Sequence, residues 1–110
     1  MPLMQTLISG VGPLPLSATF KAKGDGDVFF YVSGSAWSDV ASTLHIQLLL
    51  DGTPIGDSKA FTNEPTSHKT LVPVFIPANL TYDTHTITLE AMNNTTNTDL
   101  NDNFQVVLIY

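Results

Sequence analysis

The sequence lacks cysteine and arginine and contains only four lysines. Without cysteine, the chain can form neither a disulfide framework nor a thiolate metal site. Ten acidic residues give a net charge of −6. A charge of this sign repels nucleic acid phosphates and anionic membrane surfaces, so the composition argues against both partners.

Long apolar runs are also missing. No window approaches the ~18 consecutive apolar residues of a membrane span. The N-terminal segment, residues 1–5, has no basic stretch followed by an apolar run, so no signal peptide is visible. This pattern predicts synthesis in the cytoplasm and leaves the final location open, with a virion and export without a cleaved signal among the alternatives.

The dominant periodicity of the sequence is two. In residues 43–50, Leu44, Ile46, Leu48 and Leu50 fall on one face, with Leu49 as the exception, and residues 84–92 alternate more cleanly. Such alternation indicates half-buried strands, and no segment of ten or more residues fits a helix. Asp51-Gly52, between two apolar segments, predicts a tight hairpin. We expect about eight strands, near residues 4–9, 16–22, 28–33, 43–50, 53–61, 69–76, 84–92 and 104–110.

These features predict a single all-β domain over residues 1–110. Short strands separated by turn residues every ten positions or so are typical of a sandwich or barrel. The last strand, residues 104–110, is almost wholly apolar or β-branched. We therefore expect it in the middle of a sheet, because a terminal segment otherwise frays.

Three predicted strands are apolar on both faces: residues 28–32, 71–76 and 104–110. One sheet of a sandwich has one inner face, so the second apolar face needs another cover. Charged residues make up 13% of the chain, against ~25% in an average domain. Both observations predict a homo-oligomer, with a trimer favoured.

The final strand resembles that of C1q/TNF-like jelly-roll domains, which carry an aromatic-x-Gly-x-Leu-aliphatic-aromatic motif there. Phe104, Leu108, Ile109 and Tyr110 match the motif, whereas Val106 replaces its glycine. The resemblance implies an antiparallel jelly-roll sandwich that acts as a trimeric binding module, with no catalytic residues. The same architecture is common in capsid, phage tail and lectin domains.

The histidines show no metal-binding pattern. His45 and His85 belong to predicted strands, His68 to a loop, and no two are spaced as a local pair. Hydrogen-bonded strand and surface histidines are therefore the favoured interpretation, and we predict no cofactor.

Acidic loops leave calcium as the alternative. Asp99 and Asp102, in the segment 99–103, are the candidate ligands, and Asp25 with Asp27 form a second pair. Neither segment has the glycine and glutamate of the twelve-residue calcium loop. Asn and Asp also stabilise turns through their own backbone, which is the favoured explanation.

Catalytic patterns are equally sparse. No serine lies in a Gly-x-Ser-x-Gly elbow followed by a helix. Only Glu64 and Glu90 are available as glutamates for a pair of glycosidase carboxylates. We predict that the chain is not an enzyme; the alternative is a small metal-dependent or hydrolytic jelly-roll enzyme.

Trp37 is the only tryptophan and lies among small polar residues. Such a ring can stack on the C–H face of a sugar, or fold under its loop as a plug for the end of the sandwich, which is the favoured alternative. If the loops do bind a ligand, we expect Trp37, Asp39, His68 and Asn101 to contact it.

Two functions follow from these features. The first is a non-catalytic, oligomeric module that recognises a glycan or a protein surface through exposed loops. The second is structural assembly, as in a phage tail or a capsid decoration protein.

Overall fold

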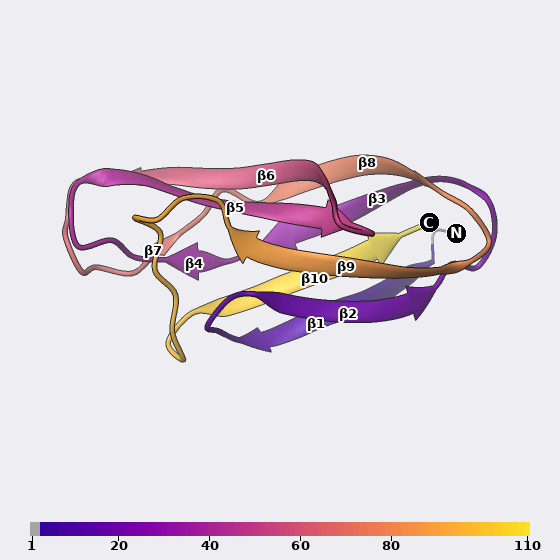
Figure 1. Ribbon diagram of the computed structural model, residues 1–110, viewed down its shortest axis with the longest axis horizontal. Coiled ribbons are helices and arrows are strands. Elements are labelled where there is room, and N and C mark those ends of the chain that lie inside the picture. Colours follow the sequence, from indigo (N-terminus) through magenta and orange to yellow (C-terminus); the bar gives the residue numbers. More distant parts are fainter. Residues whose placement is uncertain (1–2) are drawn as a thin grey trace.

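The computed structural model describes residues 3–110, which form ten strands in three antiparallel sheets (Figure 1). Over this range the chain contains no helix, and hence none long and apolar enough to cross a membrane. The strands are β1 (Met4–Val11), β2 (Leu16–Lys21), β3 (Gly26–Ser33), β4 (Ser35–Ala36), β5 (Ser42–Leu50), β6 (Thr53–Thr62), β7 (Lys69–Thr70), β8 (Val74–Leu80), β9 (Thr84–Ala91) and β10 (Asn103–Ile109).

The two large sheets pack as the layers of a sandwich. Sheet A has the strand order β1-β10-β3-β8, and sheet B the order β2-β9-β5-β6. The short strands β4 and β7 form a third sheet at one end of the sandwich (Figure 1). Both chain ends lie side by side at the opposite end, where Tyr110 N donates to Leu3 O at 2.8 Å.

The strand pairs are nested within one another along the chain. The first strand pairs with the last, β2 with β9, β3 with β8, β4 with β7, and β5 with β6. The chain is thus one long antiparallel hairpin, and the pairings β10–β3 and β5–β9 wrap it into two layers. This arrangement is a jelly roll, as the sequence predicts.

The innermost turn of this hairpin is Asp51–Gly52, between the paired residues Leu50 and Thr53. Both turn residues have positive φ, 51° and 83°. A two-residue loop of this kind matches the twist of the flanking strands, and Asp-Gly is well suited to it. The turn predicted at this position is confirmed.

The side chain of Asp51 ties this turn to β9. Its Oδ1 accepts from Thr86 N at 2.8 Å, and its Oδ2 lies 2.6 Å from Nδ1 of the buried His85. The other ring nitrogen, Nε2, lies 3.0 Å from Thr81 O. A carboxylate and a carbonyl are both acceptors, so this geometry favours the imidazolium form, in which both ring nitrogens donate.

The pKa shifts of both residues favour the charged forms that this hydrogen bonding stabilises. The hydrogen bond to Asp51, and then the one to the Thr81 carbonyl, raise the pKa of His85 above 6.5 against the opposing effect of burial. Burial alone would raise the pKa of Asp51, but the hydrogen bonds from His85 and Thr86 outweigh it and hold the pKa below 3.8.

The core lies between sheets A and B, and its largest fully buried side chains are all apolar. From β10, Phe104, Val106 and Leu108 point inward, and all three are buried. Their position confirms that the last strand runs through the middle of a sheet, between β1 and β3. A Cβ on Gly34 would lie 2.5 Å from the Phe104 ring, so this close approach requires glycine.

The outer faces of the two large sheets differ in chemistry. Sheet B carries hydrogen-bonded polar pairs, such as Gln47 with Glu90 and Ser17 with Thr88. On sheet A, the cross-strand register aligns two adjacent rows that are apolar except at Thr6. We call them the outer apolar rows; they consist of Met4, Ile109, Phe29 and Pro77, and of Thr6, Val107, Tyr31 and Phe75.

Most expected strands are confirmed, but the one predicted over residues 69–76 is wrong. The chain leaves β7 at Thr70 and enters sheet A only at Val74. Residues 71–73, which include Pro73, belong to neither strand. The next strand, β8, continues through Pro77 to Leu80. It tolerates this proline because it is an edge strand, where one side of the backbone needs no ladder partner. The two-residue strand β4 was not expected.

We predict that the Asp51→Asn variant is less stable than the wild type mainly at mildly acidic pH. The pKa of His85 is raised in the folded state. The stability that its bond to Asp51 contributes is therefore complete below pH 6.5 and is lost as the pH rises through the folded-state pKa. Asparagine tolerates positive φ, so the turn itself is kept. Urea unfolding should show a loss of about 1.5 kcal/mol near pH ~5.5, at the lower end for a charged hydrogen bond because Asp51 is half-exposed. The loss should shrink near pH ~8.5. Equal losses at the two pH values would contradict the imidazolium assignment.

Candidate functional site

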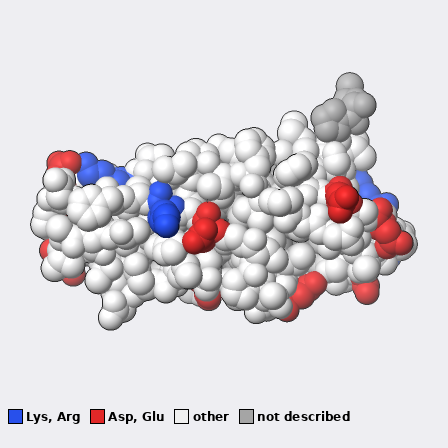
Figure 2. Space-filling view, turned by 90° about the horizontal axis from the view of Figure 1, so that it is seen from above, with Lys and Arg blue, Asp and Glu red and all other residues white. Residues whose placement is uncertain are grey.

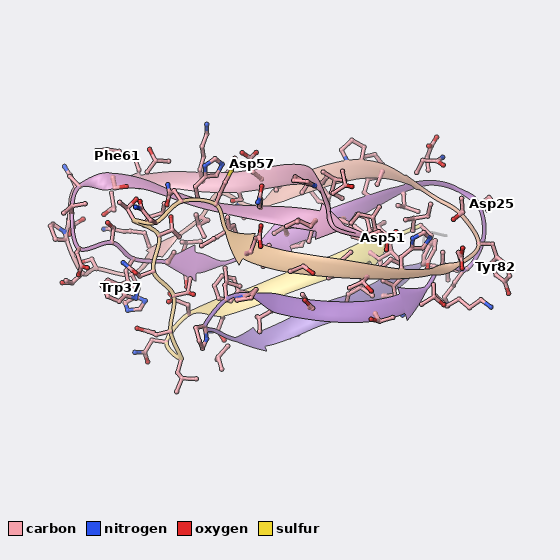
Figure 3. The ribbon with its side chains drawn as sticks, in the orientation of Figure 1. Asp25, Trp37, Asp51, Asp57, Phe61 and Tyr82 are labelled. Carbon is pink, nitrogen blue, oxygen red and sulfur yellow. The ribbon has the colours of Figure 1, made fainter. Side chains whose placement is uncertain are left out.

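The candidate site lies at the end of the sandwich that carries the β4–β7 sheet. Three segments meet there: the connection between β3 and β5, the residues just before β7, and the long connection between β9 and β10. Figure 3 shows Trp37 at this end, whereas Asp25 and Tyr82 lie at the other. The molecule measures 44 Å along its longest axis, so the two ends cannot share a small ligand.

Asp102 is the centre of this end. Its buried carboxylate accepts from Ser35 Oγ and His68 Nδ1, both at 2.7 Å, and from Asp99 N at 2.9 Å. Its backbone oxygen accepts from Gly12 N at 2.9 Å. One residue thus joins four segments that are distant in sequence, which makes the end of the sandwich rigid.

His68 is held between two carboxylates. Besides its bond to Asp102, its Nε2 lies 3.8 Å from Asp99 Oδ2. The hydrogen bond to Asp102 raises the pKa of His68 above 6.5 against the opposing effect of desolvation, and the charges of Asp102 and Asp99 add smaller contributions in the same upward direction. The exposed ring therefore favours the cationic form and balances part of the local negative charge.

Trp37 packs beside this histidine. The two ring centroids are 6.0 Å apart at an interplanar angle of 44°. The Trp37 backbone exchanges two hydrogen bonds with Asn97, of 2.9 and 2.8 Å, which fixes the residue to the β9–β10 connection. The side chain is half-buried. Its Nε1 is buried and has no hydrogen-bond partner among residues 3–110.

The remaining predicted ligand residues divide into two groups. Asn101 is exposed in the same loop as Asp99, and its backbone N donates to Asp99 Oδ1 at 2.8 Å. Asp39 is exposed on the connection that follows Trp37. Among the described residues, no hydrogen bond joins Asp39 to the other site residues. Within residues 3–110, the structure therefore brings together Trp37, His68, Asn101 and the two calcium candidates, and it joins Asp39 to none of them by a hydrogen bond.

His68, Asp99 and Asp102 are also the residues that could hold a metal ion. Their ligand atoms lie within 4.8 Å of one another. One nitrogen and two carboxylates suit zinc better than calcium, which prefers six to eight oxygens. Oδ1 of Asp102 already accepts from both Ser35 and His68, and Oδ2 accepts from Asp99 N, so only one acceptor site of this carboxylate is left for an ion. The hydrogen bonds of the cluster therefore already occupy most of the Asp102 oxygen lone pairs that a metal ion would need.

The two acids of the second calcium candidate each accept a hydrogen bond from a segment distant in the sequence. Asp25 Oδ1 accepts from Tyr82 N at 2.6 Å, and Asp27 Oδ1 accepts from Asn79 Nδ2 at 3.0 Å. Both partners lie more than 50 positions away in the chain, so these bonds join the region at the start of β3 to the region at the end of β8 and are not the local turn bonds favoured from the sequence.

The contacts of Ser35, His68 and Asp102 do not form a nucleophilic relay. A serine nucleophile needs its proton accepted by the histidine, which the carboxylate in turn orients. Here Asp102 lies between the other two and accepts from both. Within residues 3–110, no hydrogen bond joins Ser35 to His68.

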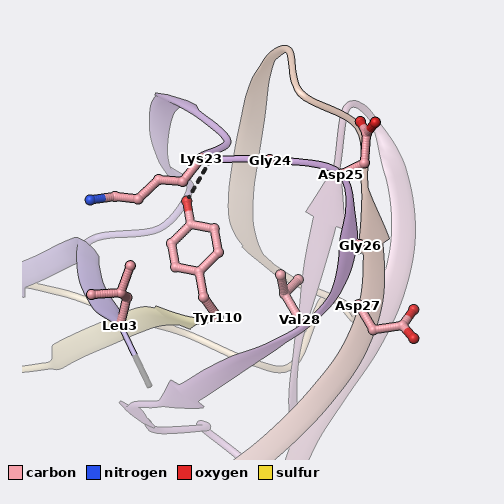
Figure 4. Close-up of a pocket in the computed structure, with 8 residues that line it drawn as sticks. All are labelled: Leu3, Lys23, Gly24, Asp25, Gly26, Asp27, Val28 and Tyr110. Carbon is pink, nitrogen blue, oxygen red and sulfur yellow. Dashed lines mark hydrogen bonds between the residues drawn. The ribbon is translucent and has the colours of Figure 1, made fainter. Parts of the chain in front are cut away.

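A small hollow lies at the opposite end of the sandwich, beside Tyr110 (Figure 4). Its volume is about 250 Å³, below the ~300–1,000 Å³ typical of ligand pockets. The Tyr110 hydroxyl accepts from Lys23 N at 3.3 Å, whereas the carboxylates of Asp25 and Asp27 point away from the ring. The hollow thus offers one aromatic ring and few convergent polar groups.

Sequence reasoning missed two members of the candidate site. Ser35 and Asn97 carry no local motif, because their partners lie far away in the chain. Ser35 bonds Asp102, 67 positions away. Asn97 bonds the backbone of Trp37, so its side-chain chemistry gives no signal.

Comparisons with known proteins find similarity only in structure. No family profile matches the sequence, and no curated protein is similar to it in sequence. Among solved structures, the chain resembles part of dimeric latent PorU from Porphyromonas gingivalis, with a TM-score of 0.64 and 8% identity. The match covers 98% of this chain but only 12% of that protein.

Two further structures are matched over most of their own length. One is the CBM36-1 domain of a multidomain xylanase from the hindgut metagenome of Trinervitermes trinervoides, with a TM-score of 0.51, 12% identity, and coverage of 100% of this chain and 97% of that one. The other is the EclA C-terminal domain, a sugar-binding protein, with a TM-score of 0.51, 13% identity, and coverage of 100% and 77%.

At these identities the similarity establishes the fold. The chain is an all-β jelly-roll sandwich of the kind also found in a carbohydrate-binding module. The comparisons support the jelly roll in general and not the C1q/TNF family in particular, so that finer resemblance stays a prediction.

We predict that Asp102→Ala destabilises the domain by about 3 kcal/mol, since it leaves buried donors without their charged acceptor. Urea unfolding measures the loss. Asp39→Ala is the matched control, because Asp39 is exposed, and it should change stability by less than about 0.5 kcal/mol. An Asp102→Ala variant as stable as the control would show that this carboxylate does not hold the loops together.

We also predict that calcium leaves the melting midpoint unchanged. The hydrogen bonds to Asp102 and the cationic form of His68 already satisfy the cluster. Thermal melts in excess calcium chloride and in a chelator should therefore coincide. A midpoint that rises with calcium concentration would establish a calcium site here, because a ligand of the folded state stabilises it.

Proposed function

We propose that this chain is a non-catalytic carbohydrate-binding module that contacts its sugar at the Trp37 end of the sandwich. One observation carries the proposal. The only tryptophan lies at one end of the fold together with polar side chains from two other segments, His68 and Asn101.

The chemistry of these groups suits a sugar ring. A pyranose presents a C–H face and a rim of hydroxyl groups. An indole packs against the C–H face, while amide and carboxylate groups pair with the hydroxyls. Asn101 and Asp99 provide such groups within one short loop. Asp99 and Asp102 leave the site with acidic character, so we expect neutral sugars to bind better than sulfated or carboxylated ones.

The rigidity of the site also supports recognition. The four segments joined by Asp102 do not need to be ordered when a ligand arrives, and a preorganised site loses less entropy on binding. The similarity to the CBM36-1 domain and to the sugar-binding EclA domain supports the same class of function at the level of the fold.

The test begins with a screen of neutral oligosaccharides on a glycan array, followed by titration. Trp37 is the only tryptophan, so its emission reports directly on this end of the molecule. We expect a bound oligosaccharide to shift or quench that emission. Calorimetry should show that Trp37→Ala abolishes binding and that Asn101→Ala weakens it about tenfold, as expected for one lost hydrogen bond.

Tyr82→Ala is the matched control, since Tyr82 is an aromatic residue, 61% exposed, at the opposite end of the sandwich. It should bind as the wild type does. A melt of each variant separates lost binding from lost folding, and the exposed Asn101 gives a second test if Trp37→Ala unfolds. No binding on the array, or binding that only Tyr82→Ala removes, would refute the proposal.

Structural assembly is the second candidate function, and the outer apolar rows of sheet A favour it. A role in a phage tail or capsid, and a trimer as the assembled state, stay predictions from the sequence. Association of the chain with a purified particle would support this candidate.

A further inference from the structure

Charge is distributed unevenly over the two sheets. Of the ten acidic and four basic residues of the chain, the strands of sheet A contain one, Asp27. Sheet B contains Lys21, Asp57, Lys59 and Glu90. In the edge view of Figure 2, one long margin of the molecule is white over its middle, whereas acidic side chains follow the other margin.

The outer apolar rows lie in the middle of this uncharged face. Three of their side chains are at least half exposed: Phe29 at 50%, Phe75 at 64% and Met4 at 71%. The rings of Tyr31 and Phe75 lie 5.2 Å apart on neighbouring strands and form a ridge. No described residue of the chain covers these exposed side chains.

Polar residues border the rows on both sides. Beyond one row lies the hydrogen-bonded pair Asp27 and Asn79, and beyond the other lie Ser9, Gln105 and Ser33. An apolar centre with a polar rim is the usual composition of a protein–protein interface, and large exposed patches of this kind mark interaction sites.

We infer that a second copy of this chain packs on the outer face of sheet A, with the outer apolar rows of the two copies in contact. The net charge of the molecule makes this face the most favourable place for contact between two copies. Two copies with a net charge of −6 repel each other over most surfaces, and this face is where they can meet with almost no charge between them. A heterologous partner steered by charge would find nothing here to pair with except Asp27.

The size of the face sets the strength of the association. With strands ~4.8 Å apart and a rise of ~3.3 Å per residue, four strands of about seven residues present a face of roughly 19 by 23 Å. A standard interface buries about 800 Å² per partner, and this face of roughly 440 Å² offers only about half of that area. We therefore expect a weak, concentration-dependent pair related by a two-fold axis, not a permanent complex.

The inference does not depend on sugar binding, because the outer apolar rows and the Trp37 end share no residue. Sedimentation velocity and light scattering over a concentration series should show one chain at low concentration and two at high concentration. Added salt should strengthen the pair, since it screens the remaining repulsion between like charges and does not weaken apolar contacts. Salt would weaken a pair held by ion pairs.

Phe75→Glu is the decisive variant, because it places a charge on one of the most exposed side chains of the patch, beside Tyr31, without touching the core. It should remain a single chain at every concentration. Phe61→Glu is the matched control: Phe61 is 68% exposed but belongs to β6 in sheet B, so this variant should pair as the wild type does. Phe29→Gln, on the neighbouring strand, provides a second test in case Phe75→Glu misfolds, and a melt of each variant checks the fold.

A wild type that stays a single chain up to its solubility limit would overturn the inference. So would association that Phe75→Glu and Phe29→Gln leave intact, or that Phe61→Glu removes. Sugar binding by a wild type that never pairs would support the proposed function while refuting this inference, so the two can fail separately.

Discussion

The two-residue turn at Asp51–Gly52 is the point at which the whole chain folds back on itself. Every other pair of strands, from β4–β7 to β1–β10, lies outside this hairpin in nested order. The turn must keep two successive residues at positive φ, and Asp51 also binds His85 and Thr86 on β9. The turn therefore shapes the innermost hairpin and holds it to the next strand of sheet B.

Nesting also explains where a binding site can form. Because the strands of each pair lie antiparallel, connections that are far apart in sequence meet at the same end of the sandwich. Ser35 and His68 arrive there on either side of the β4–β7 pair, and the β9–β10 connection adds Asp99 and Asp102. A buried carboxylate at the meeting point satisfies several donors at once, which fixes loops that would otherwise be mobile. Away from this end, the acidic contacts among the described residues are separate from one another: Asp25 bonds Tyr82, Asp27 bonds Asn79, and Asp51 bonds His85 and Thr86.

The two outer faces give the molecule a second asymmetry. Sheet B presents polar pairs such as Gln47 with Glu90, whereas sheet A presents the rings of Phe29, Tyr31 and Phe75. Strands apolar on both faces were evident in the sequence, but only the strand order shows that three of them, β10, β3 and β8, are neighbours in one sheet. Scattered apolar side chains would need no explanation; adjacent ones form a surface.

The sequence alone determined the local features of this protein. Alternating residues predicted the long strands, Asp51-Gly52 predicted its turn, and the apolar end of the chain predicted a central β10, because each depends on neighbouring residues. It also singled out Trp37, His68 and Asn101 from their residue types. Only the tertiary structure decided that these three share one end with Asp102, that Asp39 does not join them by a hydrogen bond, and that Ser35 does. The strand predicted over residues 69–76 was wrong for a related reason: the segment is divided between β7 and β8, which belong to different sheets, and only the tertiary structure decides where the chain passes from one sheet to the other. Contacts between positions 67 residues apart are set by how the nested hairpin wraps into two layers, and no local pattern of side chains encodes that wrapping.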